Sequence, residues 1–242
     1  VAAGLSTYGS ANFTLGGNGG TGGTGGEVNV YSNRNISTSG QDSHGIIADS
    51  RGGRGGTGGY SVAGALTVGQ QLGISIGGGG GSGGTGGDVN VGSGLGSWIT
   101  GTIKTSGENA AAIKALSTGG DGGSAGFSVA GAASLIGGLD FSLGRSGGSG
   151  NESGDVRVIS NAEIITTNVG AQGIFAQSLA GSGGDAGFTA TGGLSHGNTI
   201  NLTVGGGGGS GNTAGTVTVG SFGSINTQGI NAKGIQAVSQ GG

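Results

Sequence analysis

The side chains that could carry acid–base or nucleophilic chemistry are few in this sequence. Its 242 residues include two histidines, His44 and His196, and no cysteine. A catalytic base must lie within hydrogen-bond reach of the group it activates and of a partner that orients it. The two histidines fall at non-equivalent positions of the repeat described below. We therefore expect both to be surface residues, and we expect the protein not to be an enzyme.

A row of acidic residues is the next candidate, because Glu27, Asp88 and Asp155 recur at one position of the repeat. With two coils per repeat they would lie ~10 Å apart, too far to share an ion at ~2.3–2.6 Å ligand distances. The segment ending in Asp88 resembles a calcium-binding nonapeptide, but polar Asn90 stands where that motif needs an apolar residue. We predict solvated residues beside a turn, with no metal and no cofactor.

Composition excludes several classes of protein. Eight Lys and Arg residues against eleven Asp and Glu give a net charge of −3 and no basic stripe for nucleic acid. No apolar run approaches the ~18 residues of a membrane-spanning helix. Glycine supplies 70 residues and proline none, which excludes a collagen triple helix because that fold also needs abundant imino acid.

The apolar residues recur as four copies of one unit. A V-x-V segment begins at Val28, Val89, Val156 and Val217, at spacings of 61, 67 and 61 residues. The same register aligns Phe13, Ile74, Phe141 and Leu202, and also Ile36, Ile103, Ile164 and Ile225. Residues 1–242 therefore form a single repeat array, which we expect to be a fragment of a longer protein.

Within each unit, apolar residues alternate with polar ones, as in Val28 and Val30 or Phe13 and Leu15. This period of two predicts half-buried strands whose apolar side chains point inward. Between the strands lie glycine blocks with a period of three, such as 16–26 and 52–59. Three residues per turn is the period of a polyproline II helix, whereas a flexible linker is the alternative interpretation.

These patterns predict an all-β fold, a right-handed parallel β-solenoid in which the glycine blocks stack on one another. Each unit holds two glycine blocks, so a block at one fixed corner implies about two coils per 61-residue repeat; three shorter coils are also consistent. Strands in such a stack need their N–H groups for the neighbouring coil, which explains the absence of proline.

The second unit carries a six-residue insertion within Gly92–Gly101, which contains the only tryptophan. Loops on a rigid scaffold often bind partners, so Leu95, Trp98 and Ile99 are the candidate partner-binding residues. The alternative is that Trp98 and Ile99 fold back to cover the stack.

Three segments, NISTSGQDSHGIIADS (35–50), AEIITTNVGAQGIFAQS (162–178) and GSINTQGINAKGIQAVSQGG (223–242), carry a family resemblance. With their neighbouring glycine blocks they resemble the passenger repeats of large Gram-negative autotransporter adhesins. The second unit departs from the family pattern at Ala112, where a glycine is expected. The resemblance implies secretion, an extracellular or cell-surface location, and a role in attachment or biofilm.

We therefore expect a non-enzymatic extracellular structural or adhesive module, a stalk or adhesin passenger whose partner is a host or matrix surface. The alternative is a self-assembling filament subunit whose coils associate end to end. A third, weaker alternative is a carbohydrate-active β-helix protein, which would need clustered acids or bases on one face.

Overall fold

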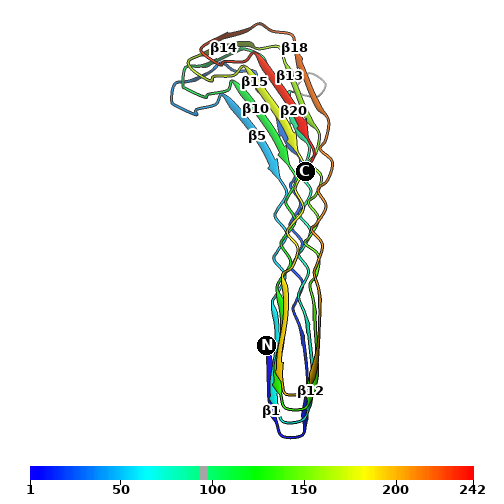
Figure 1. The fold of residues 1–242 in the computed structure, drawn as a ribbon. Helices are drawn as coiled ribbons and strands as arrows, with labels where there is room; N and C mark the ends of the chain where they lie inside the picture. Colours follow the sequence, from blue (N-terminus) through cyan, green and yellow to red (C-terminus); the bar gives the residue numbers. More distant parts are fainter. Residues whose placement is uncertain (93–97) are drawn as a thin grey trace.

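The computed structural model describes residues 1–92 and 98–242, and it is built from strands and extended glycine segments (Figure 1). Twenty strands form five parallel sheets of four strands each, and the described residues contain no helix. Every sheet takes one strand from each of the four units. The predicted parallel β-solenoid is confirmed.

Sheets A and B form one end of the molecule, which we call the two-sheet lobe. Sheet A contains β1 (Ala2–Ser6), β6 (Ser61–Thr67), β11 (Ser128–Ser134) and β16 (Thr189–Ser195). Sheet B contains β2 (Gly9–Leu15), β7 (Gln70–Ile76), β12 (Gly137–Leu143) and β17 (Asn198–Val204).

Sheets C, D and E form the other end, which we call the three-sheet lobe. Sheet C contains β3 (Val28–Val30), β8 (Val89–Val91), β13 (Val156–Ser160) and β18 (Val217–Ser221). Sheet D contains β4 (Ile36–Thr38), β9 (Thr102–Thr105), β14 (Glu163–Thr167) and β19 (Ile225–Gln228). Sheet E contains β5 (Ile46–Arg51), β10 (Ile113–Thr118), β15 (Ile174–Leu179) and β20 (Ile235–Gln240).

Each unit makes one coil, so the expectation of about two coils per repeat is wrong. Val28 pairs with Val89, Val89 with Val156, and Val156 with Val217. The molecule therefore has four long coils, not eight short ones. The reason lies in the glycine blocks: the first block of a unit carries the chain from the two-sheet to the three-sheet lobe, and the second carries it back (Figure 1).

The glycine blocks stack as predicted, and they form two hydrogen-bonded layers. Within one layer, the N–H of Gly19 donates to the carbonyl of Gly79 in the next coil (2.9 Å). Between layers, the N–H of Gly56 donates to the carbonyl of Gly20 (2.7 Å). These contacts recur every three residues along the block, as expected for packed polyproline II helices. The blocks are therefore an ordered shaft between the lobes, and the flexible-linker alternative is wrong.

Close approach of neighbouring backbones explains why glycine fills two of every three positions. A Cβ atom added at Gly19 would overlap the carbonyl oxygen of Gly56 in the opposite layer. One added at Gly81 would overlap the carbonyl oxygen of Gly20 in the same layer. Third positions such as Thr21 and Thr24 are exposed and accept other side chains.

The three-sheet lobe has an ordinary apolar core. Its strands turn their alternating valine and isoleucine residues inward, among them Val89, Ile103 and Ile113, all fully buried. Threonines of this lobe cap the turns that follow three strands of sheet D. Thr38 Oγ1 donates to the carbonyl of Ser43 (2.7 Å), and Thr105 and Thr166 make the equivalent bonds to Ala110 and Ala171. Here the alternation of apolar and polar residues predicted the buried face correctly.

The two-sheet lobe has the opposite arrangement, so the inward orientation expected for its apolar residues is wrong. Phe13 and Leu15 are 62% and 60% exposed, whereas Thr14 between them is buried. The same reversal holds in β7 and β12, where Ser75 and Ser142 are fully buried. Polar residues and small alanines, such as Ala63 and Ala130, fill this interior, and the large apolar residues cover its outside.

A ladder of hydroxyl groups satisfies much of that polar interior. Ser61 Oγ donates to Thr14 Oγ1 (2.6 Å), and Ser75 Oγ donates to Ser61 Oγ (2.9 Å). Ser128 Oγ continues the chain to Ser75 Oγ at 3.0 Å and lies 2.8 Å from Ser142 Oγ. Small hydroxyl residues permit two sheets to pack with paired polar atoms between them, because buried hydroxyls need hydrogen-bond partners. This pairing is what allows the apolar side chains to face outward.

Candidate functional site

The acidic row beside sheet C connects successive coils. Because a unit is one coil, neighbouring members lie about one strand spacing apart, ~4.7–4.9 Å, and the predicted ~10 Å separation is wrong. Asp88 Oδ1 accepts the backbone N–H of Asp155 (2.8 Å), and Asp155 Oδ1 accepts that of Thr216 (2.7 Å). Asp88 and Asp155 thus each bind the backbone of their counterpart in the next coil. Glu27 instead accepts from the side chain of Asn90 in the next coil, Oε1 to Nδ2 3.2 Å. These contacts give the acidic row a structural role.

The same bond recurs elsewhere on the solenoid. Asn18 Oδ1 accepts the N–H of Gly79 (2.9 Å), and Asp121 Oδ1 accepts the N–H of Ser182 (3.0 Å). In each pair the donor lies one unit beyond the acceptor. Acidic and amide side chains therefore satisfy N–H groups at outward positions, which the glycine packing leaves without a carbonyl partner.

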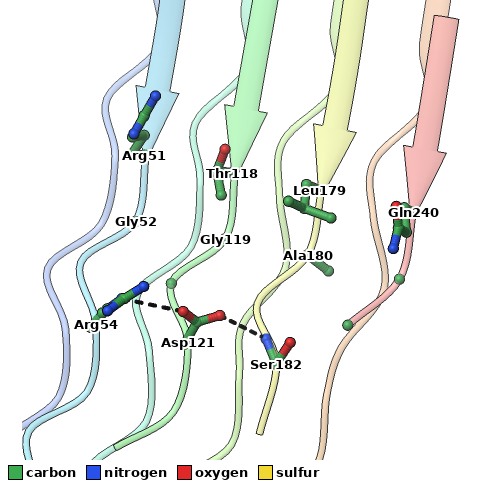
Figure 2. A pocket seen from close by; sticks show the side chains of 13 residues that line it. Arg51, Gly52, Arg54, Thr118, Gly119, Asp121, Leu179, Ala180, Ser182 and Gln240 are labelled. Atoms are coloured by element: carbon green, nitrogen blue, oxygen red, sulfur yellow. Dashed lines mark hydrogen bonds and ion pairs between the residues drawn. The ribbon is translucent and has the colours of Figure 1, made fainter.

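A shallow cleft of about 450 Å³ lies where sheet E meets the glycine shaft (Figure 2). Its two cations are already paired: Arg54 Nε lies 3.2 Å from Asp121 Oδ2, and Arg51 Nη2 lies 2.8 Å from Asp49 Oδ2. Figure 2 shows the Arg54, Asp121 and Ser182 side chains in one row across three coils. Since both guanidinium groups have a carboxylate partner, the cleft offers no unpaired cation to an anionic ligand.

A polar cleft of about 310 Å³ surrounds His44, beside the turn between β4 and β5. His44 Nδ1 accepts the backbone N–H of Ala111 (2.9 Å), so Nε2 carries the proton of the neutral ring. Lys114 Nζ lies 3.5 Å from Nε2. Burial, and then the Lys114 charge, lower the pKa of His44, while Asp42 opposes this change. His44 is thus half-buried and structural, and not the solvent-facing residue we expected.

His196 lies in the other lobe, exposed in the turn between β16 and β17. The structure therefore does not bring the two histidines together. Among residues 1–92 and 98–242, no group of three or more His, Asp or Glu side chains is placed to hold a metal ion.

The insertion residues have separate environments. Ile99 is fully buried in the core of the three-sheet lobe and bridges to Ser160 of β13. Trp98 is 45% exposed, and its ring stacks on Phe222 with centroids 5.3 Å apart and planes 12° apart. Leu95 lies outside the described residues. Of the three candidate partner-binding residues, the structure thus presents Trp98 at the surface, next to an aromatic residue that sequence reasoning did not connect with it.

Most of the exposed large apolar side chains among the described residues lie on the two-sheet lobe. Sequence reasoning missed them because it expected the apolar residues of these strands to point inward. Four outward rows lie on sheet B, each with one residue per coil: one holds Gly9, Gln70, Gly137 and Asn198, and three are wholly apolar. The apolar rows are Ala11, Leu72, Leu139 and Ile200; Phe13, Ile74, Phe141 and Leu202; and Leu15, Ile76, Leu143 and Val204. Contiguous apolar surface of this kind marks an interaction site in soluble proteins.

Sheet A is also apolar outside, but its middle row lacks large side chains. That row is Ala3, Gly64, Gly131 and Gly192. It runs between a row of Val1, Val62, Val129 and Ala190 and a row of Leu5, Leu66, Ala133 and Leu194. Beside them, Tyr60 stacks on Phe127 with ring centroids 5.2 Å apart. The lobe thus has two opposite apolar faces of different shape.

Charge is almost absent from this lobe. Its strands and turns span 1–15, 60–76, 127–143 and 188–204, and Asp140 is their only Asp, Glu, Lys or Arg. Asp140 is buried between the sheets, where Oδ1 accepts from Gln71 Nε2 (3.2 Å). Asp140 Oδ2 and Gln71 Oε1 have no hydrogen-bond partner. Burial raises the pKa of Asp140, so the interior favours its neutral form.

The described part of the chain contains no helix that is long and apolar enough to cross a membrane. No family model matches the chain, and neither a curated protein nor a solved structure matches it.

Proposed function

We propose that this chain is a non-enzymatic extracellular structural and adhesive module, a stalk or adhesin passenger that displays an apolar contact surface. The observation that carries the proposal is the reversed two-sheet lobe, in which Phe13 and Leu15 face solvent while Thr14 is buried. Exposing large apolar side chains costs solubility and contributes no burial energy, so a contact role is the simplest reason for this arrangement.

The shaft supports a stalk role, because it holds the two lobes apart with ordered backbone. An 11-residue block such as 16–26 spans about 34 Å at the ~3.1 Å rise per residue of a polyproline II helix. Hydrogen bonds in two directions connect it to its neighbours. Stability in such an array accumulates from coil-to-coil contacts, which suits an extended surface structure that has no large core.

The chemistry-bearing side chains support a non-enzymatic role. Asp88, Asp121 and Asp155 accept backbone N–H groups of the next coil, and His44 accepts that of Ala111. A general base needs an accessible lone pair near a substrate. These groups already have structural partners, and the apolar lobe holds no exposed carboxylate or lysine.

The proposal is tested by adhesion of the purified chain to hydrophobic and matrix-coated surfaces, measured by quartz-crystal microbalance. We expect the double variant Phe13→Ser, Leu15→Ser to reduce the adsorbed mass several-fold. The matched control is Val28→Ser, Val30→Ser, which lowers stability in the three-sheet lobe without changing the two-sheet lobe. Equal adsorption by the Phe13→Ser, Leu15→Ser variant and the unmodified chain would refute an adhesive role for this surface.

End-to-end assembly into a filament is the second candidate function, and the open sheet edges favour it. Strands β1–β5 lie at one end of the five sheets and β16–β20 at the other, so both ends carry unpaired strand edges. Such edges are templates for further strands. Micrometre fibres of the purified chain, one molecule wide in electron micrographs, would support this function; monomers at all concentrations would exclude it.

A further inference from the structure

Two hydrogen-bond donors face each other in the cleft around His44. His44 Nδ1 accepts the backbone N–H of Ala111, so its Nε2 carries the proton, and Lys114 Nζ lies 3.5 Å from that Nε2. An ammonium group can only donate. Neither atom can accept from the other, whereas an oxygen acceptor placed against both would receive two hydrogen bonds. The pair therefore suits a ligand with an anionic oxygen.

The charge of Lys114 has no counter-charge within the described part of the chain. Among residues 1–92 and 98–242, the two ion pairs belong to Arg51 and Arg54, and no carboxylate pairs with Lys114. Lys114 is half-buried, in contrast to the exposed Lys104 of β9. Solvent screens a half-buried charge less than an exposed one, so Lys114 attracts an anion more strongly than a lysine on an open strand face does.

The cleft forms because a small residue interrupts a row of long polar side chains. In register, one position of the four units holds His44, Ala111, Gln172 and Lys233. Ala111 is buried, and the space above it is lined by His44 and Gln172 on the neighbouring coils. The adjacent strands contribute Lys114 and Phe175, which pair in register. The volume, about 310 Å³, lies at the lower end of the range for small-molecule sites, about 300–1,000 Å³.

The other lining groups suit a ligand that carries hydroxyl groups. The side-chain amides of Asn109, Gln172 and Gln236 line the cleft, and each amide has both donors and an acceptor. Gln172 Nε2 donates to Gln236 Oε1 (2.9 Å), so Gln172 Oε1 and Gln236 Nε2 remain able to pair with a ligand. A hydroxyl both donates and accepts, and it can pair with either atom. Phe175 adds a half-buried apolar ring to these polar groups.

The charges of the cleft favour a ligand with a single negative charge. Of the described residues that line it, Lys114 is the cation and Asp42 is the carboxylate. Lys233 lies beside the lining, where its Nζ donates to Gln236 Oε1 (3.2 Å). A dianion such as phosphate would bring two negative charges to one lining cation and close to Asp42. A carboxylate brings one charge, so the cleft favours a carboxylate over a phosphate.

We propose that the His44 cleft binds an acidic sugar, with the carboxylate of a uronic acid held by Lys114 Nζ and His44 Nε2 and its hydroxyls held by the neighbouring amides. A free uronic acid and a uronic acid unit of a polysaccharide present the same carboxylate and hydroxyls. The site belongs to the three-sheet lobe, so it goes beyond the proposed adhesive role of the surface around Phe13 and does not depend on it.

Titration of the unmodified chain with galacturonate tests the proposal, because NMR spectra can follow both imidazole rings. The charged groups that face the His44 ring are Lys114 of β10 and Asp42 of its own turn. A carboxylate bound beside Nε2 stabilises the charged ring, so the pKa of His44 should rise on addition of galacturonate. His196 is exposed in the other lobe, and its signals should not move. Galacturonate binding that leaves His44 unchanged would overturn the proposal.

Two lysine variants with the same change of charge separate this site from general attraction. Lys114→Gln removes the cation and places at this position the residue of the equivalent Gln236. We expect it to weaken galacturonate binding about ten-fold or more in calorimetric titrations, as loss of a half-buried charge partner does. Lys104→Gln removes a charge from an exposed position and should leave the affinity within about two-fold. Equal weakening by both variants would show nonspecific attraction and overturn the proposal.

A series of ligands tests which groups are recognised. Galactose and galacturonamide lack the charged carboxylate, and acetate lacks the hydroxyls, so all three should bind more weakly than galacturonate. Inorganic phosphate that binds as tightly as galacturonate would overturn the proposal. The source of the ligand follows from galacturonate oligomers: tighter binding than that of the monosaccharide identifies a polysaccharide unit, and weaker binding identifies the free acid.

The sugar site and the adhesive surface fail separately. The Phe13→Ser, Leu15→Ser chain should bind galacturonate as the unmodified chain does, because its changes lie in the other lobe. A chain that adsorbs to surfaces but binds no galacturonate retains its proposed function and refutes the site.

Discussion

Asp155 Oδ1 accepts a 2.7 Å hydrogen bond from the backbone N–H of Thr216, its counterpart one coil further along the solenoid. The bond connects equivalent positions of consecutive units. A carboxylate that could act in catalysis thus connects two coils instead. The contribution of this hydrogen bond to stability can be measured.

Asp155→Ala removes this acceptor and leaves the Thr216 N–H to solvent. We expect a loss of about 1 kcal/mol in the free energy of unfolding, the usual net value of one hydrogen bond, measured by urea denaturation. Asp155→Asn keeps an oxygen at the same place and should lose less. Equal losses in the two variants would show that charge, and not the hydrogen bond, matters here.

The shaft offers a matched pair of alanine substitutions. Gly81→Ala places a Cβ atom on the carbonyl oxygen of Gly20, whereas Gly20→Ala places one where no atom lies within 4 Å. We expect Gly81→Ala to lower stability by about 1–3 kcal/mol, as overpacking does. Gly20→Ala should be neutral or stabilising by up to about 1 kcal/mol, because alanine restricts the unfolded chain. Thermal unfolding of both variants measures the contrast, and similar melting temperatures would contradict the packed-layer arrangement.

Asp140 predicts a pH dependence in the two-sheet lobe. Burial raises its pKa in the folded state, so the folded chain holds this proton more tightly than the unfolded chain. The resulting stabilisation is complete below the ordinary Asp value of about 3.9 and is lost as pH rises through the folded-state pKa.

Asp140→Asn keeps the neutral form at every pH. It also replaces the unpartnered Oδ2 atom with an amide nitrogen that can donate a hydrogen bond. We expect the variant to be more stable than the unmodified chain at neutral pH and nearly equal to it below pH 4, in denaturation curves recorded across that range. A variant that is less stable at pH 7 would contradict the buried-carboxyl interpretation.

His44 predicts a dependence of the opposite sign in the three-sheet lobe. Its pKa is lowered in the folded state by burial and then by Lys114, so protonation favours the unfolded chain. Its contribution to stability is present above about pH 6.5, the ordinary value, and falls as pH drops toward the folded-state pKa. Protonation also removes the Nδ1 lone pair that binds the Ala111 N–H.

His44→Gln places at this position the residue found at the equivalent Gln172. Between pH 7 and pH 5, the free energy of unfolding should therefore fall less in this variant than in the unmodified chain. An unchanged loss would assign the titration to another group.

Trp98 is a single fluorescent reporter for its stack on Phe222. Phe222→Ala removes the stacked ring, so Trp98 emission should shift to longer wavelength as water reaches the indole. Stability should fall by about 0.5–1.5 kcal/mol, the value of an aromatic pair. Phe188→Ala, which removes an exposed ring in the other lobe, is the control. If Phe222→Ala leaves the emission unchanged, the stack does not form in solution.

Much of this molecule was predictable, because stacked coils leave equivalent residues in one row. The rows of Val28 and Ile36 follow from alternation and spacing alone. Less of the candidate site could be predicted from the sequence. The insertion that interrupts the repeat indicates Trp98. Its partner Phe222 lies two units further along the chain, and no local sequence pattern relates the two residues.

What the sequence determined by itself was the repeat, the strand period and the register of one unit on the next, since each depends only on spacing along the chain. Tertiary structure decided the number of coils and which face of each strand is buried. Alternation is symmetric between the two faces of a strand, so the same sequence pattern is compatible with a buried Phe13 or with a buried Thr14. Hydroxyl pairing inside the two-sheet lobe, such as that of Ser61 with Thr14, selected the polar face for the interior. Antiparallel packing of glycine blocks, in which Gly56 binds Gly20, closed each coil after a full unit.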